Sequence, residues 1–384
     1  MSIAIVFGLV CALLQFLAWQ SDGRAADDAE QLIRIRSVES NLLHADALAT
    51  NAFLVGGLED PDQREQYDTA INDVFTDITD AAKAQPADRE ALAALIVEIN
   101  DYTDAVAQAR VNNRQGFPVG AEYLSGASAA LRAEAMPILT NLADANTERT
   151  EDAMGGQHPI WLLLLGVLAL VGLWWLNRQL AQHFRRRINV GFAVAAGIVL
   201  VVTLVAVAAA YRGDSQNDSL LSDELDTATR QAIARTAGND AKALESLRLI
   251  KRGSGELYEE PWRTAAAVVV EKAVGSTDEE WTAYADFHEA IVKLDERDRW
   301  FSAVIQATAR DEDDNETADT STAAFEAFDN ASERVVDTNG TKTSDELRSG
   351  RGLALAGSAI TLLLGIVAAV AVARGIGARR KEYA

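Results

Sequence analysis

The residue types that carry catalytic or metal chemistry do not form a working pattern in this sequence. It has no phosphate-binding loop, no GxSxG or HExxH motif, and no Cys/His spacing that suits a metal. The histidines His44, His158, His183 and His288 are far apart, so we expect ordinary surface or interface residues rather than ligands. We therefore predict a protein that is not an enzyme, with no catalytic residue, no cofactor and no metal site.

Two short segments combine residue types that suit recognition. Residues 112–120 hold amides, an arginine, two glycines and a phenylalanine, and residues 251–258 hold a basic pair, two glycines and a tyrosine. Each is also a helix-breaking turn, and the acidic run Asp311–Glu316 can neutralise the second. That run lacks the glycine and the terminal glutamate of an EF-hand, which disfavours a calcium site. We predict partner binding by Arg110, Asn112, Asn113, Arg114, Gln115, Phe117, Lys251, Arg252 and Tyr258.

A third candidate is the basic triplet Arg185, Arg186 and Arg187 in the short linker 177–189. It is first a topology signal, since basic residues next to membrane spans favour the cytoplasmic side. The same triplet can dock a cytoplasmic acidic partner or anionic lipid headgroups.

Four apolar stretches must position these segments. We predict transmembrane helices at 1–19, 158–176, 190–211 and 353–373, because each stretch is long enough to cross a hydrocarbon core of about 30 Å. No span contains an ionisable residue, which disfavours transporters and pumps. The mildly polar residues inside them, Gln15, Thr203, Ser358 and Thr361, are expected to make helix-packing contacts.

Charge predicts the orientation of the spans. The linker 177–189 and the tail 374–384 carry net charges of +4 and +3, whereas the long segments 20–157 and 212–352 carry −15 and −14. The positive-inside rule then places both termini and the linker in the cytoplasm and both long segments outside the plasma membrane. Acidic segments of this size disfavour nucleic acid as a partner. No basic residue precedes the first span, so we expect a few natural residues before Met1.

Both long segments have helical periodicity, so we predict an all-α integral membrane protein with two extracytoplasmic up-down four-helix bundles. A weak echo, Glu122 to Ser128 and Glu326 to Ser332, suggests a duplication. Cys11 is the single cysteine, so packing alone must hold the bundles together. The predicted helices are 20–55, 62–84, 88–113 and 119–153, then 214–251, 256–273, 278–310 and 319–349.

The direction of each helix predicts how far each turn lies from the membrane. The first helix of each bundle leaves the membrane, so the turns at 56–62, 112–118, 251–255 and 311–318 are predicted to be membrane-distal. A helix of about 35 residues rises about 50 Å, which would carry these turns well clear of the bilayer.

The layout of span, four helices and span resembles the sensor region of bacterial chemoreceptors. Its tandem form is similar to the GlnX-like actinobacterial membrane proteins, and the segments that carry the resemblance are Ala109–Gly116, Val119–Leu124 and Leu247–Glu259. The resemblance implies coupling of an extracytoplasmic amino-acid-binding lipoprotein (GlnH-like) to a cytoplasmic Ser/Thr kinase (PknG-like). It also implies that glutamate, aspartate or related amino acids are the ligands sensed.

These observations favour a non-enzymatic transmembrane signal relay, with homo-oligomers possible. Direct binding of a small solute between the helices is compatible with the same layout. The alternative is a scaffold or accessory subunit of a membrane transport or envelope complex, which would need no response to a ligand.

Overall fold

The computed structural model describes residues 1–55, 61–114, 119–184, 189–308 and 319–382; for residues 55, 114, 181–184 and 378–382 it describes the backbone alone. Several predictions therefore fall outside the described residues: Gln115, Phe117, the triplet Arg185, Arg186 and Arg187, the run 311–316, and the side chain of Arg114.

The part of the chain that the structure describes is almost entirely helical and contains no strand, which confirms the predicted all-α class. Most helices begin and end where the prolines and glycines predict; Pro61, Pro86 and Pro159 each occupy a first helical position, where a missing N–H costs nothing. In chain order the elements are α1 (Ser2–Val55), α2 (Pro61–Ala84), η1 (Pro86–Asp88), α3 (Arg89–Arg114), α4 (Val119–Ala130), η2 (Leu131–Ala135), α5 (Met136–Met154), α6 (Pro159–Phe184), α7 (Val190–Leu220), η3 (Leu221–Leu225), α8 (Asp226–Ile250), η4 (Gly255–Tyr258), α9 (Glu259–Lys272), α10 (Thr277–Asp295), α11 (Trp300–Ala307), α12 (Ser321–Ser349) and α13 (Arg351–Glu382).

Four helices within the described residues are long and apolar enough to cross a membrane, as the sequence predicts. They suggest a multi-pass membrane protein. The boundaries of the spans and loops, and the side of the membrane on which each loop lies, stay predictions.

The helices form two compact units. The first comprises residues 1–28, 149–222 and 343–384, and the second comprises residues 29–148 and 223–342. We call residues 29–148 the first half of the second unit and residues 223–342 its second half.

Small and mildly polar residues bring the helices of the first unit together. Gly8 of α1 and Gly365 of α13 touch backbone to backbone, since a Cβ on Gly8 would lie 2.8 Å from the Gly365 Cα. Gln15 Nε2 donates to Thr361 Oγ1 over 3.0 Å. Ser358 Oγ donates to the Ala12 carbonyl over 2.8 Å. These contacts confirm the predicted packing role of Gln15, Ser358 and Thr361, and small residues are what lets helices approach closely in lipid.

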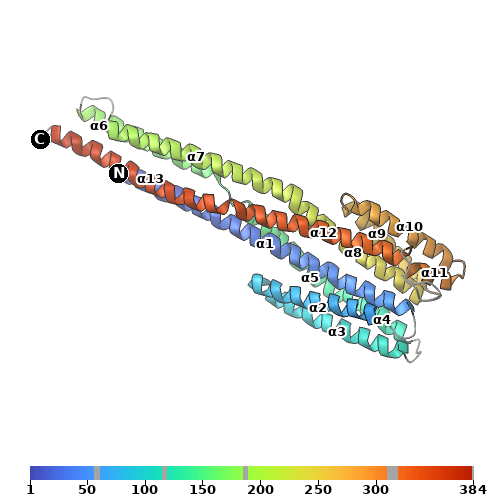
Figure 1. Cartoon of the computed structure of the whole chain (residues 1–384). Helices are drawn as coiled ribbons and strands as arrows, with labels where there is room; N and C mark the ends of the chain where they lie inside the picture. Colours follow the sequence, from blue (N-terminus) through green and yellow to red (C-terminus); the bar gives the residue numbers. More distant parts are fainter. Residues whose placement is uncertain (56–60, 115–118, 185–188, 309–318, 383–384) are drawn as a thin grey trace. The chain divides into compact units, whose positions relative to one another are not determined.

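The first half of the second unit buries the apolar residues that repeat every three or four positions along its helices. In Figure 1, α2 and α3 lie side by side, and they also pack against each other. Each fully buried side chain of this kind contributes about 1.5–3 kcal/mol. The largest buried members are Leu32, Ile35, Val38 and Leu42 of α1, Tyr67, Val74 and Ile78 of α2, Leu92, Leu95, Ile99, Tyr102 and Val106 of α3, and Leu124, Leu131 and Leu139 of the α4–η2–α5 segment.

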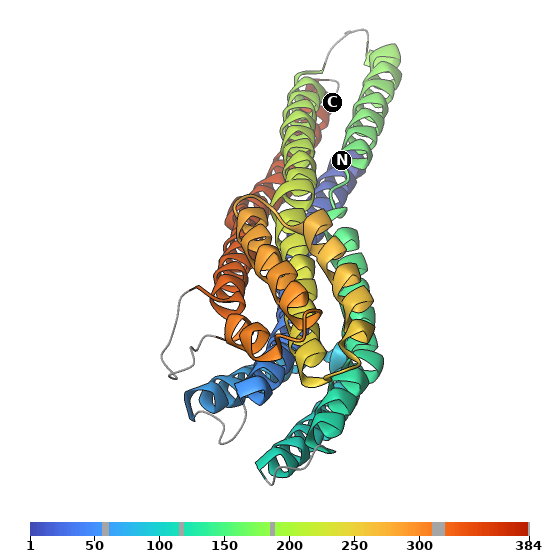
Figure 2. The same ribbon diagram turned by 90° about the vertical axis from the view of Figure 1, so that its right-hand side faces the viewer.

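The second half has an aromatic core drawn from four helices. In Figure 2, the orange helices α9 and α10 lie against the yellow α8, which both contact. Trp281 and Phe328 meet edge to face with ring centroids 5.2 Å apart. Tyr284 and Phe325 do the same at 5.3 Å. Aromatic pairs of this geometry add about 0.5–1.5 kcal/mol beyond the area they bury.

One predicted helix is wrong. The segment 278–310 was expected to be continuous, but it divides into α10 and α11, and Asp298 between them has a φ of 59°. The Arg299 N–H donates to the Leu294 carbonyl over 3.0 Å, which closes a tight turn. Beyond the turn Ala303 and Ala307 of α11 are fully buried. Tertiary packing therefore overrides the helical periodicity at this point.

A buried glutamine bonds to the internal turn of each half, as a donor in the first half and as an acceptor in the second. Gln31 of α1 is buried and donates to the Ala81 carbonyl over 3.2 Å and to Asp88 over 3.1 Å, at the turn between α2 and α3. Gln231 of α8 is buried too, and its Oε1 accepts from the Val274 N–H at 2.9 Å, at the turn between α9 and α10. This shared device supports the duplication suggested by the sequence echo.

Candidate functional site

The structure places the described residues of the first predicted recognition segment at the end of α3. The Arg110 guanidinium lies over the Tyr67 ring, 4.2 Å from its centroid. Asn112 Nδ2 donates over 2.9 Å to the Gln108 carbonyl of its own helix. Asn113 is half-buried in the last turn of α3. Whether these residues bind a partner stays a prediction.

The residues of the second predicted segment sit where α8 ends. Gly253 has a φ of 80°, a left-handed conformation that L side chains rarely adopt, and this lets the chain reverse into η4. Lys251 Nζ lies 2.5 Å from Glu122 Oε1 of α4, so it joins the second half to the first. The Arg252 guanidinium lies over Trp300 of α11 at 3.7 Å. Tyr258 packs against the aromatic core instead of standing free.

A buried charge cluster that the sequence analysis did not single out joins the two halves through Asp46. Asp46 of α1 has no exposed surface. Its carboxylate accepts hydrogen bonds from Tyr102 Oη at 3.1 Å, from Ser128 Oγ, and from Arg132 Nη1 at 3.1 Å. Arg132 also places its Nε 2.6 Å from Asp240 Oδ1 of α8. One guanidinium is therefore shared by an acid of each half.

The backbone around Arg132 is irregular. It lies in η2, a π-helical turn (Leu131–Ala135) inserted between α4 and α5. Such turns are rare and are frequent at functional sites; each adds one residue to the helix and changes which face the helix presents. Burial alone would lower the pKa of the Arg132 guanidinium, but Asp240 and Asp46 outweigh it and raise that pKa. The side chain is therefore charged when it bridges the halves.

A second cluster joins the halves through Asp329 of α12. Arg235 of α8 binds this carboxylate with two parallel bonds of 2.9 Å each, the two-pronged geometry that suits a guanidinium. Asn239 Nδ2 donates to Asp329 over 2.7 Å. Arg235 then extends to α1, where its Nη1 donates to Asn41 Oδ1 over 3.0 Å. His44 of α1 lies 3.0 Å from Asn239 Oδ1.

Electrostatics fix the charge state of Asp329. Burial would raise the pKa of its carboxyl, but the charges of Arg235 and His44 and the bonds from Arg235 and Asn239 hold that pKa at about 2. The carboxylate is thus ionised at neutral pH. Removing one partner of such a buried pair would leave an uncompensated charge, which typically costs 3–5 kcal/mol.

A cavity of about 610 Å³ opens beside this second cluster. It lies between α1, α2, α8 and α12, so both halves contribute to its wall. Carboxyl, amide and hydroxyl groups dominate the lining, with the Arg235 guanidinium and the His44 imidazole among them. The lining residues are Asn41, His44, Leu48, Asp62, Glu65, Gln66, Thr69, Ala70, Asp73, Arg235, Glu326, Asp329, Asn330 and Glu333.

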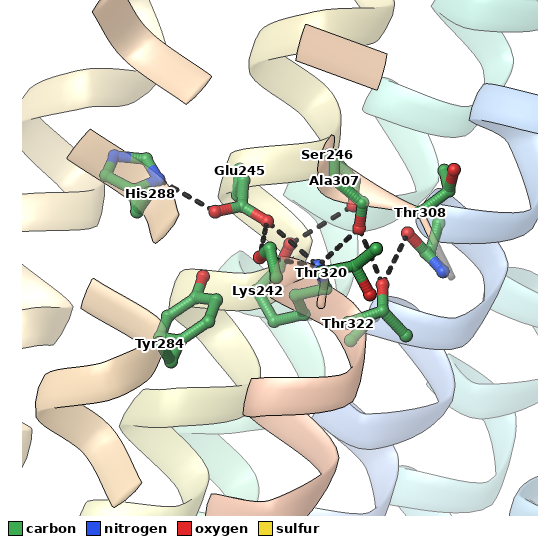
Figure 3. A network of polar contacts seen from close by, with 12 residues as sticks. Lys242, Glu245, Ser246, Tyr284, His288, Ala307, Thr308, Thr320 and Thr322 are labelled. Atoms are coloured by element: carbon green, nitrogen blue, oxygen red, sulfur yellow. Dashed lines mark hydrogen bonds and ion pairs between the residues drawn. The ribbon is translucent and has the colours of Figure 1, made fainter. Parts of the chain in front are cut away.

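The second half encloses a third cluster, which Figure 3 shows from close by. Lys242 Nζ donates to Glu245 Oε1 over 2.8 Å and to the Ala307 carbonyl over 3.2 Å. Glu245 Oε2 lies 3.0 Å from His288 Nδ1. Thr322 Oγ1 donates to the same Ala307 carbonyl over 2.7 Å. Four helices, α8, α10, α11 and α12, are therefore tied at one level.

The protonation of this third cluster follows from its contacts. Burial would raise the pKa of Glu245, but Lys242 and His288 hold it at about 2. Burial would lower the pKa of His288, but its hydrogen bond to Glu245 and the Glu259 carboxylate 3.6 Å from its Nε2 outweigh burial and raise that pKa. The Trp262 ring stacks on the imidazole at 3.6 Å, which leaves the ring little freedom to turn away.

His288 corrects one sequence expectation. It was expected to be an ordinary surface or interface residue, yet it is only 2% exposed and paired with two carboxylates. A sequence signal for these clusters existed, since Asp46 continues the apolar stripe that contains Ile35, Leu42 and their neighbours at three- and four-residue spacing. A charge on the core face of a helix predicts a buried, paired group.

The comparisons with known proteins found one match, to a family model that covers part of the chain. Residues 21–155 match the family model of the actinobacterial sensor domain. No curated protein and no solved structure matches the chain. The similarity to an actinobacterial sensor domain covers about a third of the chain, and the matched residues include the first half of the second unit.

Proposed function

We propose that this protein is a non-enzymatic transmembrane signal relay that senses amino acids outside the plasma membrane. The sensor-domain match and the four candidate spans support signal sensing in a membrane protein. The observation that carries the relay is the shared guanidinium of Arg132, because it makes the sensor half and the second half electrostatically dependent on each other.

In this proposal each half is an up-down four-helix bundle outside the cell, and both termini and the linker 177–189 lie in the cytoplasm. A glutamate- or aspartate-binding lipoprotein docks on the predicted recognition residues at the ends of α3 and α8. A cytoplasmic Ser/Thr kinase reads the response through the basic triplet at 185–187. The resemblance to GlnX-like proteins supports these partners and the amino-acid ligands.

The relay requires two states of the second unit that bind the lipoprotein with different affinity. Buried charge clusters suit such a switch. A guanidinium that pairs with two carboxylates can adopt only a few discrete positions, so the helices that carry them have only a few stable arrangements. The π-helical turn at η2 supports the same idea, because removing or moving one such turn shifts the register of a helix.

The test is whether amino-acid binding and the bridge are linked. The full-length protein in nanodiscs is titrated with purified glutamate-binding lipoprotein, with and without glutamate, as wild type and as Asp240→Asn. The proposal expects lipoprotein binding that depends on glutamate in the wild type, and a dependence reduced at least about fivefold in the variant. A response that is identical in both proteins would exclude the bridge from the relay.

A further inference from the structure

Arg252, just after α8, and Trp300 and Phe301 at the start of α11 form an aromatic tip, in which Arg252 and Phe301 are exposed and Trp300 is partly buried. Phe301 is 74% exposed. Arginine and aromatic residues are the types most enriched at the centres of protein interfaces. The composition of the tip therefore indicates an interaction surface.

The side chains of this tip are held in place before any partner arrives. Trp300 Nε1 donates to the Leu249 carbonyl over 2.8 Å. The Phe301 ring meets the Trp300 ring edge to face, with centroids 5.1 Å apart and an angle of 78°. The Arg252 guanidinium covers the Trp300 ring at 3.7 Å and lies 5.7 Å from the Phe301 centroid. Ordering in advance lowers the entropy cost of binding.

The backbone conformation before α11 places Phe301 at the surface. Asp298 adopts a φ of 59°, uncommon for a residue other than glycine, and so breaks the helix between α10 and α11. After the break, Ala303 and Ala307 are fully buried while Phe301 on the same short helix points to solvent. The backbone is therefore strained next to an exposed aromatic ring. Strain of this kind is concentrated at functional sites, which supports a binding role for the Phe301 ring.

A surface with the opposite character lies on the first half. A groove of about 380 Å³ runs between α3 and the α4–η2 segment, with an apolar floor and a rim of carboxylates. Val119 and Tyr123 beside it are 50% and 42% exposed. Nothing lies within 4 Å of the position a Cβ would take on Gly126 in its wall. The rim carboxylates belong to Glu98, Asp101, Glu122 and Glu134.

Lys251 of the same chain already pairs with Glu122 at this rim, whereas Glu98, Asp101 and Glu134 form no ion pair with any side chain that the structure describes. Glu98 and Glu134 lie close enough to interact, and the neighbouring Glu134 carboxyl raises the pKa of Glu98. Two carboxyls held together repel when both are ionised, and a guanidinium placed between them would relieve the repulsion. Apolar cavities of about 150 Å³ already accept a benzene ring, so the groove has room for a phenylalanine side chain and a neighbouring arginine head.

We propose that the aromatic tip of one copy of this chain docks into the α3–α4 groove of a second copy, with Phe301 on the apolar floor and Arg252 between the rim carboxylates. The Lys251–Glu122 ion pair shows that the tip and the start of α4 lie at the same level of the second unit. Two copies side by side can therefore make the contact twice, once in each direction. Such a reciprocal arrangement closes into a two-fold dimer.

The first test measures oligomeric state. The full-length protein in detergent is examined by light scattering as wild type, Arg252→Glu, Glu134→Arg and the double variant. We expect a dimer that each single variant weakens at least about tenfold and that the double variant partly restores, because the swap recovers one pair of opposite charges between the tip and the rim. Lys83→Glu, an exposed charge reversal on α2, is the matched control and should leave the dimer intact.

The second test locates the contact in native membranes. Copies with Phe301→Cys and copies with Gly126→Cys are co-expressed in a Cys11→Ala background and oxidised. We expect a disulfide-linked species of twice the chain mass, absent when Lys83→Cys replaces Phe301→Cys. A monomeric wild type, a dimer indifferent to both charge reversals, or no cross-link between cysteines that each react with maleimide would overturn the proposal. Loss of lipoprotein binding in Arg252→Glu while the dimer persists would instead assign the tip to that partner.

Discussion

Arg132 Nε lies 2.6 Å from Asp240 Oδ1 in the second half, while Nη1 of the same side chain lies 3.1 Å from the fully buried carboxylate of Asp46 in the first half. Arg132 is itself about a quarter exposed, at 24%. The bridge is therefore reachable by water at one end and sealed at the other. A change in either half alters the position or the charge environment of this guanidinium.

Replacing Arg132 by methionine should destabilise the protein by about 3–5 kcal/mol, because Asp46 would remain buried without its guanidinium partner. Thermal unfolding of the full-length protein in detergent is the measurement. Arg64→Met is the control: Arg64 makes an exposed pair with Asp68, and such pairs contribute about 0–1 kcal/mol. Equal melting temperatures for Arg132→Met and Arg64→Met would show that the bridge contributes nothing to stability.

Acid should weaken the fold through Asp329. Its pKa is about 2 in the folded protein against an ordinary 3.8, so its stabilising effect is complete above about pH 4 and is lost as pH falls toward 2. The contribution is about 2 kcal/mol. We expect Asp329→Asn to flatten the decline in melting temperature between pH 4 and 2. The exposed Asp68→Asn should keep the wild-type slope; parallel slopes for all three proteins would contradict the assignment.

His288 should make the folded protein less stable as pH rises, which is the opposite pH dependence to that of Asp329. Its pKa in the folded protein is raised above the ordinary 6.5, so its stabilising effect is complete below pH 6.5 and is lost as pH rises through the raised value. Melting temperatures measured from pH 6 upward should therefore fall in the wild type and stay level in His288→Gln. The exposed His158→Gln serves as the control, and a wild type whose stability rises over this range would rule out the charged, doubly paired imidazole.

The contact between Gly8 and Gly365 should tolerate no added side chain. A Cβ on Gly8 would lie 2.8 Å from the Gly365 backbone, so Gly8→Leu must push α1 and α13 apart, at a cost of about 1–3 kcal/mol. Gly197→Leu in α7 is the matched control, because open space surrounds that position. The free energy of unfolding of the two variants is compared in detergent. A similar loss of stability in both would contradict a close-packing role for Gly8.

Much of the fold could be predicted from the sequence because its signals are local. The apolar spans are long and free of charge, and Pro61, Pro86 and Pro159 mark positions where helices begin in the structure. The break at Asp298 carried no such signal: no glycine or proline marks it, and only the packing of Ala303 and Ala307 explains it.

The candidate site was harder to predict because it depends on contacts distant in the chain. The pairing of Arg132 with Asp240 spans more than a hundred residues, and the irregular turn that carries Arg132 has no known sequence mark. Lys251 and Arg252 were predicted to be recognition residues from the composition of their segment. Their partners Glu122 and Trp300 only became visible once the helices were packed.

The most direct test of the proposed relay is the binding of a purified glutamate-binding lipoprotein to the full-length protein in nanodiscs, with and without glutamate or aspartate. The account predicts binding whose affinity changes by about 5- to 150-fold when the amino acid is present, the range typical of coupled sites. An affinity that is the same in both conditions, or no binding in either, would contradict a partner-mediated amino-acid relay.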